Sequence, residues 1–95
     1  MAKFAVQTEH EADHGWEYQV EVVHDGGEVT EHRVSLAWVD HDHWCGGRLA
    51  PSRVVEAVLG YLDARKLLDS LPPKFDAARA RRLSPEIDQE LRYAL

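Results

Sequence analysis

Apolar and polar residues alternate along two consecutive stretches of the chain, 16–22 and 30–38. In the first stretch, Trp16 and Tyr18 begin a series of apolar residues at even positions, and Glu17 begins the polar residues between them. The second stretch repeats this pattern. A period of two is typical of a strand that buries one face and leaves the other in water. The pattern therefore predicts two strands that share one aromatic and aliphatic face.

Asp25-Gly26-Gly27 lies between these stretches and predicts a tight turn, because glycine adopts positive φ at no steric cost. The two strands are then expected to form an antiparallel hairpin. A five-residue loop over 25–29 places Trp16 opposite Trp38, and a loop two residues shorter keeps the same faces. Both registers put the aromatic residues on the buried side.

The segment before the hairpin is predicted to be mostly a connecting loop. Phe4 and Val6 predict a short first strand, and the polar stretch 8–15 separates it from the hairpin. We therefore expect three strands, paired in antiparallel fashion.

Helical signals dominate from residue 40 onward. Asp40 is expected to cap one turn, which Gly46-Gly47 ends in a left-handed conformation. Pro51 is placed to start a long helix, in which apolar residues recur at i, i+3, i+4 and i+7. Asp76 and Ser84-Pro85 are expected to start two short helices.

These elements predict a single α+β domain, a small three-stranded antiparallel sheet with two to four C-terminal helices packed on one face. The length agrees, since 95 residues can bury one core with little stability to spare. The expected division is an antiparallel sheet, a connecting turn and a helical part, over residues 1–39, 40–50 and 51–95.

Composition narrows the possible functions. The chain carries 11 basic and 17 acidic residues, a net charge of −6, which disfavours nucleic acid and anionic membranes as partners. No apolar run approaches the ~20 residues of a membrane-spanning helix, and the start of the chain lacks a signal-peptide core, so we expect a cytoplasmic protein with no membrane partner. The single cysteine, Cys45, excludes an intrachain disulfide and a cysteine-rich zinc module.

The charge is unevenly distributed along the chain. Residues 1–47 hold two basic and ten acidic residues, a net charge of −8, whereas residues 48–95 have a net charge of +2. One interpretation is that an acidic sheet face and a basic helix each bind a partner. The other is that the two parts are solvated separately and complement each other. The candidate partner-binding residues are the basic cluster, Lys74, Arg79, Arg81 and Arg82.

The densest group of potential metal ligands is His41, His43 and Cys45. On a helical turn His41 and Cys45 point the same way, and in an extended chain all three do, an arrangement that can hold zinc, nickel or copper. Cys45 with either histidine is also the one conceivable pair of nucleophile and base. The alternative is that Trp44 and Cys45 belong to the core and the histidines are solvated. We expect no bound cofactor.

His24 and His32 flank the predicted turn on the same face as the aromatic residues. Because imidazole titrates near neutral pH, the two side chains could make the hairpin pH-sensitive. The alternative is that they border the core, with a polar ring atom reaching solvent.

The order of features resembles a family of small uncharacterised bacterial proteins with a β-hairpin, a Pro-initiated helix and short C-terminal helices. The matching segments are His32-Arg33-Val34-Ser35-Leu36, residues 51–62, Phe75-Asp76 and Pro85-Glu86-Ile87. Ala50 stands where a serine cap is expected, and Ala77 and Ala80 replace bulkier apolar residues. The family has no established activity, so the resemblance implies a fold and no site residue.

No catalytic motif is present, and the sequence therefore predicts a non-enzymatic module, monomeric or homodimeric, that binds a protein partner. Transition-metal binding through His41, His43 and Cys45 is the alternative.

Overall fold

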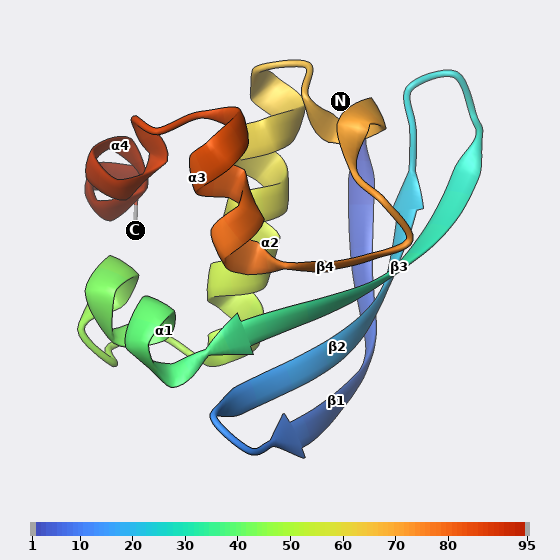
Figure 1. The fold of residues 1–95 in the computed structure, drawn as a ribbon. Coiled ribbons are helices and arrows are strands. Elements are labelled where there is room, and N and C mark those ends of the chain that lie inside the picture. The colour runs from blue at the N-terminus through green and yellow to red at the C-terminus, as the bar shows by residue number, and fades with distance from the viewer. Residues whose placement is uncertain (1, 95) are drawn as a thin grey trace.

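The computed structural model describes residues 2–94, which form a mixed four-stranded sheet and four α-helices (Figure 1). The predicted α+β class is confirmed. The strands lie in the order β1-β2-β3-β4, and their bounds are β1 (Lys3–Ala12), β2 (Gly15–Val23), β3 (Val29–Ala37) and β4 (Lys74–Asp76). The helices are α1 (Trp38–Cys45), α2 (Pro51–Ala64), α3 (Ala80–Leu83) and α4 (Ile87–Ala94), with 3-10 turns η1 (Leu68–Ser70) and η2 (Ala77–Arg79).

The β2–β3 hairpin has the shorter of the two predicted loops. Val23 pairs with Val29, and the amide of His24 donates to the carbonyl of Glu28 at 2.8 Å, which closes a loop over Asp25-Gly26-Gly27. Gly27 has φ +89°, the left-handed conformation for which glycine is needed. In this register Trp16 lies opposite Leu36 rather than Trp38.

Strand β1 is much longer than predicted. It continues through the polar segment to Ala12, with a bulge between Val6 and Thr8, and pairs with β2 along its whole length. Beyond the bulge both faces of β1 are exposed. The hydrophobic alternation disappears there because the strand end projects beyond the core, so the sequence carries no buried face to detect.

The prediction of three antiparallel strands missed β4, which pairs in parallel with β3. Phe75 on β4 is buried, the amide of Arg33 donates to the carbonyl of Pro73 at 2.7 Å, and the Ser35 hydroxyl donates to Asp76 at 2.7 Å. Three residues are too short a segment to show a periodic pattern.

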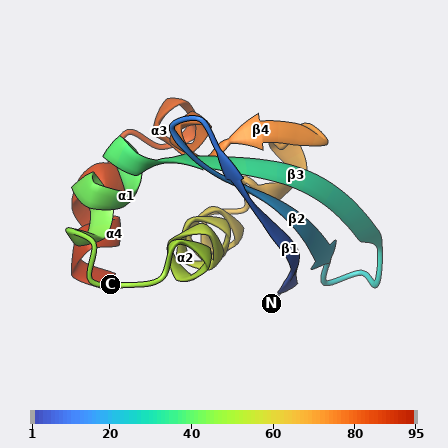
Figure 2. The same ribbon diagram turned by 90° about the horizontal axis from the view of Figure 1, so that it is seen from below.

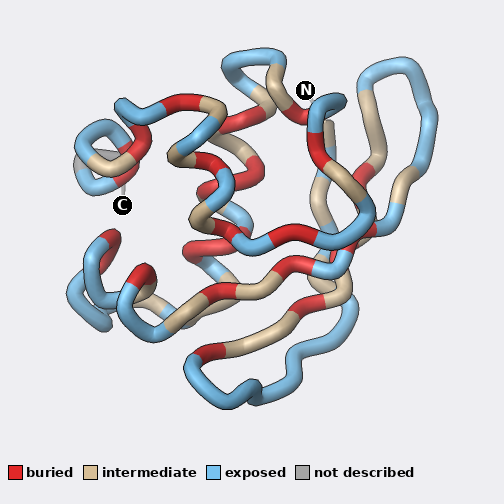
Figure 3. The backbone as a smooth tube through the Cα atoms, viewed as in Figure 1, coloured by how far each residue is buried: buried red, intermediate tan, exposed pale blue. Residues whose placement is uncertain are grey.

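One hydrophobic core lies between the sheet and α2. Figure 2 shows α2 against the concave face of the curved sheet, with α1 and α4 beyond the end of β3 rather than on that face. Val54, Val55, Val58, Leu59 and Leu62 of α2 are buried, and Figure 3 marks the buried parts of the backbone in red. Among residues 2–94 no helix has both the length and the apolar character needed to cross a bilayer.

The segment after β3 is helical from Trp38, earlier than predicted. Ala37 occupies the N-cap position, so Asp40 lies inside α1 and does not cap it. Gly46 ends the helix with φ +63°, as predicted, and Pro51 begins α2, also as predicted. The Asp76 carboxylate caps η2 by accepting from the amide of Ala78 at 2.9 Å.

Candidate functional site

The predicted basic cluster is divided between two environments. Lys74 on β4, Arg79 on η2 and Arg82 on α3 are exposed. Arg81 instead turns toward the other helices, and its guanidinium is engaged within the fold. The cluster therefore offers three solvent-facing cations to a partner.

Arg81 joins α3 to α1 and α4. It donates from Nη1 to Asp40 and from Nε to Asp88, each at 2.6 Å, and its guanidinium lies 4.7 Å from the centre of the Trp44 ring. The indole of Trp44 donates to the same Asp88 oxygen at 2.9 Å. Burial opposes ionisation of Asp88, but the hydrogen bonds from Arg81 and Trp44 outweigh it and lower the pKa of Asp88. This network joins the three helices and occupies Nε and Nη1 of Arg81.

The structure does not bring His41, His43 and Cys45 together as a ligand set. His41 Nε2 lies 2.7 Å from the carbonyl of Leu49, which only accepts, so this nitrogen carries a proton and has no lone pair for a metal. His43 Nε2 lies 3.7 Å from Asp88. Cys45 is buried, with 3% of its surface exposed. In the part of the chain that the structure describes, no three His, Cys, Asp or Glu residues are grouped to hold a metal ion.

The surface with the clearest binding character lies where β3 passes into α1. Trp38 is 53% exposed and the adjacent Val39 is 72% exposed. The amide of Trp38 donates to the carbonyl of His14 at 2.8 Å, and the two rings meet edge to face with centroids 6.1 Å apart. The backbone of Trp38 is thus tied to the β1–β2 turn and its ring contacts His14, although about half of the residue faces water.

A hollow of about 330 Å³ adjoins this surface. Gly15 and Ala37 are among its small lining residues, and His14, Trp16 and Asp76 also contribute to it. Gly15 pairs with Ala37, and its lack of a side chain allows the two strands to lie close together there. The hollow and the exposed indole together give this end of the sheet a surface that is partly apolar and partly concave.

The open face of the sheet is not acidic. Since Tyr18, Val20 and Val22 face the core, the alternate positions face outward, and they carry both signs of charge. Arg33 Nε lies 3.7 Å from Glu17. The acidic residues of this face are Glu17, Glu21, Glu31 and Asp76, and the basic residues are Lys3, Arg33 and Lys74. The net charge of −8 over residues 1–47 therefore does not form a single acidic sheet surface.

Trp38 was missed as a surface residue because its even position fits the alternation of a buried strand. The signal against burial is the next residue: Trp38 and Val39 are consecutive apolar residues, and a strand that buries one face cannot bury both. The break in alternation marks the end of the strand.

Comparison of the chain with protein-family models, with curated proteins and with solved structures finds no match. The resemblance to a family of small bacterial proteins therefore stays a prediction.

Proposed function

We propose that this protein is a non-enzymatic module that binds a protein partner, with Trp38 as the central contact. The observation that supports the proposal is the exposure of Trp38 and Val39 side by side at the junction of β3 and α1, where the backbone of Trp38 is bonded to His14. Exposed tryptophan is costly in water and is enriched among the residues that dominate binding energy at protein interfaces. The His14 carbonyl fixes the backbone of Trp38 and the His14 ring contacts the indole, which reduces the entropy lost when a partner covers it.

The charges around Trp38 indicate what kind of partner would fit. Asp42 is one helical turn beyond Trp38 in α1, and Asp13 precedes His14 in the neighbouring turn; both are exposed. A complementary surface would offer an apolar pocket for the indole and basic residues at its rim.

Selection of peptides from a displayed random library tests this proposal. We expect the selected peptides to combine an apolar or aromatic residue with Lys or Arg and to bind more weakly at high salt. Trp38→Ala should raise the Kd of such a peptide at least about tenfold. Val29→Ala is the matched control, because Val29 is also 53% exposed but lies at the opposite end of β3.

The charge-reversal variant Arg79→Glu/Arg82→Glu distinguishes the second surface. Unchanged binding by this variant supports the Trp38 surface. If the variant loses binding while Trp38→Ala keeps it, the partner binds the basic cluster instead. Peptides that bind wild type and Trp38→Ala equally would contradict the proposal.

A further inference from the structure

Four side chains and a carbonyl form a continuous polar chain at the hairpin end of the sheet. His24 Nδ1 lies 3.4 Å from Asp69, and His24 Nε2 lies 2.8 Å from the Thr30 hydroxyl. The same hydroxyl lies 2.9 Å from His32 Nε2, and His32 Nδ1 lies 2.9 Å from the carbonyl of Pro72. The chain thus connects the hairpin to both ends of the segment 69–72.

The positions of the protons follow from the Pro72 carbonyl, which can only accept and is the hydrogen-bonded end of the chain. The Pro72 carbonyl requires a proton on His32 Nδ1. In neutral His32 the Nε2 atom then accepts, so the Thr30 hydroxyl donates to it and has no second hydrogen for His24. His24 Nε2 must therefore donate to Thr30, which leaves a lone pair on His24 Nδ1 facing the Asp69 carboxylate.

One additional proton satisfies every group in the chain. Placed on His24 Nδ1, it gives an ion pair with Asp69 at 3.4 Å. Placed on His32 Nε2, it reverses the Thr30 hydroxyl, and His24 then accepts at Nε2 and donates to Asp69 from Nδ1. The two arrangements differ by a proton shift through Thr30, so both histidines share one positive charge.

We propose that this chain is a proton-operated clasp that holds the segment 69–72 against the hairpin. With the proton bound, Asp69 and His24 form an ion pair; without it, a lone pair faces a carboxylate and the end of the clasp at Asp69 is released. Because the closed form holds one proton more than the open form, closure is favoured as pH falls through the range in which imidazole titrates and is lost as pH rises.

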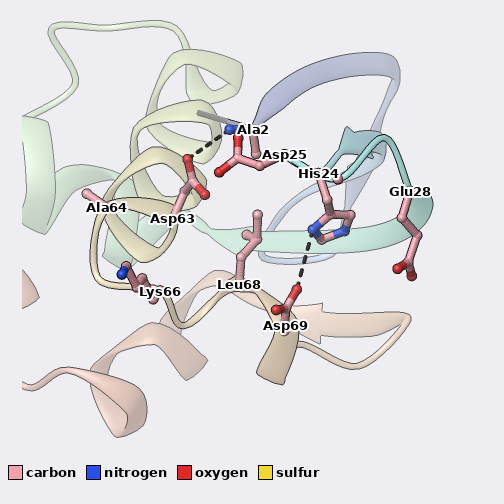
Figure 4. A pocket seen from close by; sticks show the side chains of 10 residues that line it. Ala2, His24, Asp25, Glu28, Asp63, Ala64, Lys66, Leu68 and Asp69 are labelled. Atoms are coloured by element: carbon pink, nitrogen blue, oxygen red, sulfur yellow. Dashed lines mark hydrogen bonds and ion pairs between the residues drawn. The ribbon is translucent and has the colours of Figure 1, made fainter.

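The surroundings of the clasp are acidic on the His24 side. His24 lies in the wall of a pocket of about 600 Å³, shown in Figure 4, together with Lys66 and four acidic residues, Asp25, Glu28, Asp63 and Asp69. A smaller neighbouring hollow shares His24, Glu28 and Asp69 with this pocket and is also lined by Thr30 and His32. His32 is buried, and its ring lies edge-on to Phe75. Besides the Thr30 hydroxyl, its polar contact is the Pro72 carbonyl. Acidic groups thus outnumber the single lysine around the site.

Opening of the clasp would loosen the cover of the core at this end. Leu68 and Leu71 on either side of Asp69 are buried, and Leu68 lines the 600 Å³ pocket beside His24. Release of Asp69 would therefore widen the pocket and expose apolar surface far from Trp38, at the opposite end of β3.

Nitrogen-15 NMR of the imidazoles tests the proton arrangement directly. At pH 8 we expect His32 as the Nδ1–H tautomer, which is the less common one in solution, and His24 as the Nε2–H tautomer. His32 found as the Nε2–H tautomer at pH 8 would overturn the proposal.

A double-mutant cycle with His24→Gln and Asp69→Asn tests the clasp itself. Asp69 is 94% exposed, so its substitution leaves the fold intact, and an exposed ion pair of this kind corresponds to a coupling of about two- to fivefold in the unfolding constant. We expect that coupling from urea unfolding at pH 5.5 and none at pH 8. Equal coupling at both pH values, or none at either, would refute the clasp.

Thr30 variants separate the relay from simple packing. Thr30→Ser keeps the hydroxyl and should keep His24 and His32 coupled, whereas Thr30→Val keeps the shape and should uncouple them. In Thr30→Val the His24–Asp69 coupling should still depend on pH, but the nitrogen-15 signals of His32 should no longer respond to His24→Gln. His10→Gln is the control for histidine titration, because His10 is exposed on β1 and lies outside the chain of contacts. A response of His32 to His24→Gln that survives Thr30→Val, or a pH dependence of the His24–Asp69 coupling that disappears in His10→Gln, would contradict the proposal.

Discussion

The Arg81 guanidinium donates to the Asp40 carboxylate at 2.6 Å across 41 residues of sequence. The same guanidinium binds Asp88, so one side chain joins α1, α3 and α4. Burial opposes the charge on Arg81, but the hydrogen bonds to both carboxylates outweigh it and raise the pKa of Arg81. α3 spans four residues and α1 eight, too few to be stable helices alone, and this contact supplies part of what holds them together.

Replacement of Arg81 should therefore destabilise the fold. In Arg81→Met the carboxylate of Asp40, which is buried, loses its partner. Removing one partner of a fully buried pair costs about 3–5 kcal/mol, and partial exposure of Arg81 reduces the expected loss to about 2 kcal/mol in urea unfolding. Arg82→Met is the control, because Arg82 is exposed, and should change the free energy of unfolding by less than about 0.5 kcal/mol. Equal effects of the two substitutions would contradict the role assigned to Arg81.

Asp88 should make the protein sensitive to acid. Its pKa is lower in the folded state than the ordinary aspartate value, so its ionised form stabilises the fold above that value, and the stabilisation is lost as the pH falls below about 4. Asp88→Asn should cost about 1 kcal/mol at pH 6, an amount limited by the partial exposure of Asp88, and the difference from wild type should shrink steadily as the pH falls below about 4. Urea midpoints measured across this range check the prediction. A difference that stays constant with pH would show that Asp88 does not act through its charge.

Much of the fold follows from periodicity, and the differences arise where periodicity is absent. The hairpin and α2 each bury one face, so their sequences alternate with periods of two and 3.6. Strand β4 has three residues, and the distal part of β1 has no buried face. Both are held by backbone pairing to a neighbouring strand, which leaves no trace in the side-chain pattern.

The candidate sites were harder to predict because charge and ligand type do not reveal orientation. Arg79, Arg81 and Arg82 look equivalent in sequence, but the short α3 turns Arg81 inward toward two aspartates. The contact of His24 with His32 through Thr30 could be predicted in part from the sequence, since the alternation placed both histidines on one face. Asp69 and the Pro72 carbonyl reach them through contacts distant in sequence.

Gly15 should be intolerant of any side chain. A Cβ atom there would lie well inside van der Waals contact with the Leu36 carbonyl oxygen and 2.8 Å from Ala37 Cα, both of which belong to backbone that is fixed by strand pairing. We expect Gly15→Ala to cost about 2–3 kcal/mol, as overpacked sites do. Gly60→Ala is the matched control: a Cβ atom at this position in α2 meets nothing within 4 Å and should stabilise the protein by about 0.5–1 kcal/mol. Tolerance of alanine at Gly15 would contradict the close strand contact.

Zinc should not bind the segment 41–45 with a defined stoichiometry. His41 Nε2 is committed to the Leu49 carbonyl, and Cys45 is buried. We expect the thermal midpoint to be the same in EDTA and in a small excess of zinc chloride. A saturable rise in the midpoint that His43→Ala abolishes would restore the metal hypothesis.

Cys45 should react slowly with thiol reagents while the protein is folded. Because Cys45 is 3% exposed and lies beside the buried Trp44, a reagent reaches the sulfur only when α1 opens. We expect the labelling rate at neutral pH to be at least about a hundredfold below that of the chain in urea, since reaction through an opened form scales with its small population. Arg81→Met should accelerate labelling, because it weakens the contact that holds α1 to α3 and α4, whereas His43→Ala should leave the rate unchanged. A rapid reaction of the folded protein that His43→Ala slows would instead identify His43 as a base for an accessible thiol, and would revive the hypothesis of a Cys45 nucleophile.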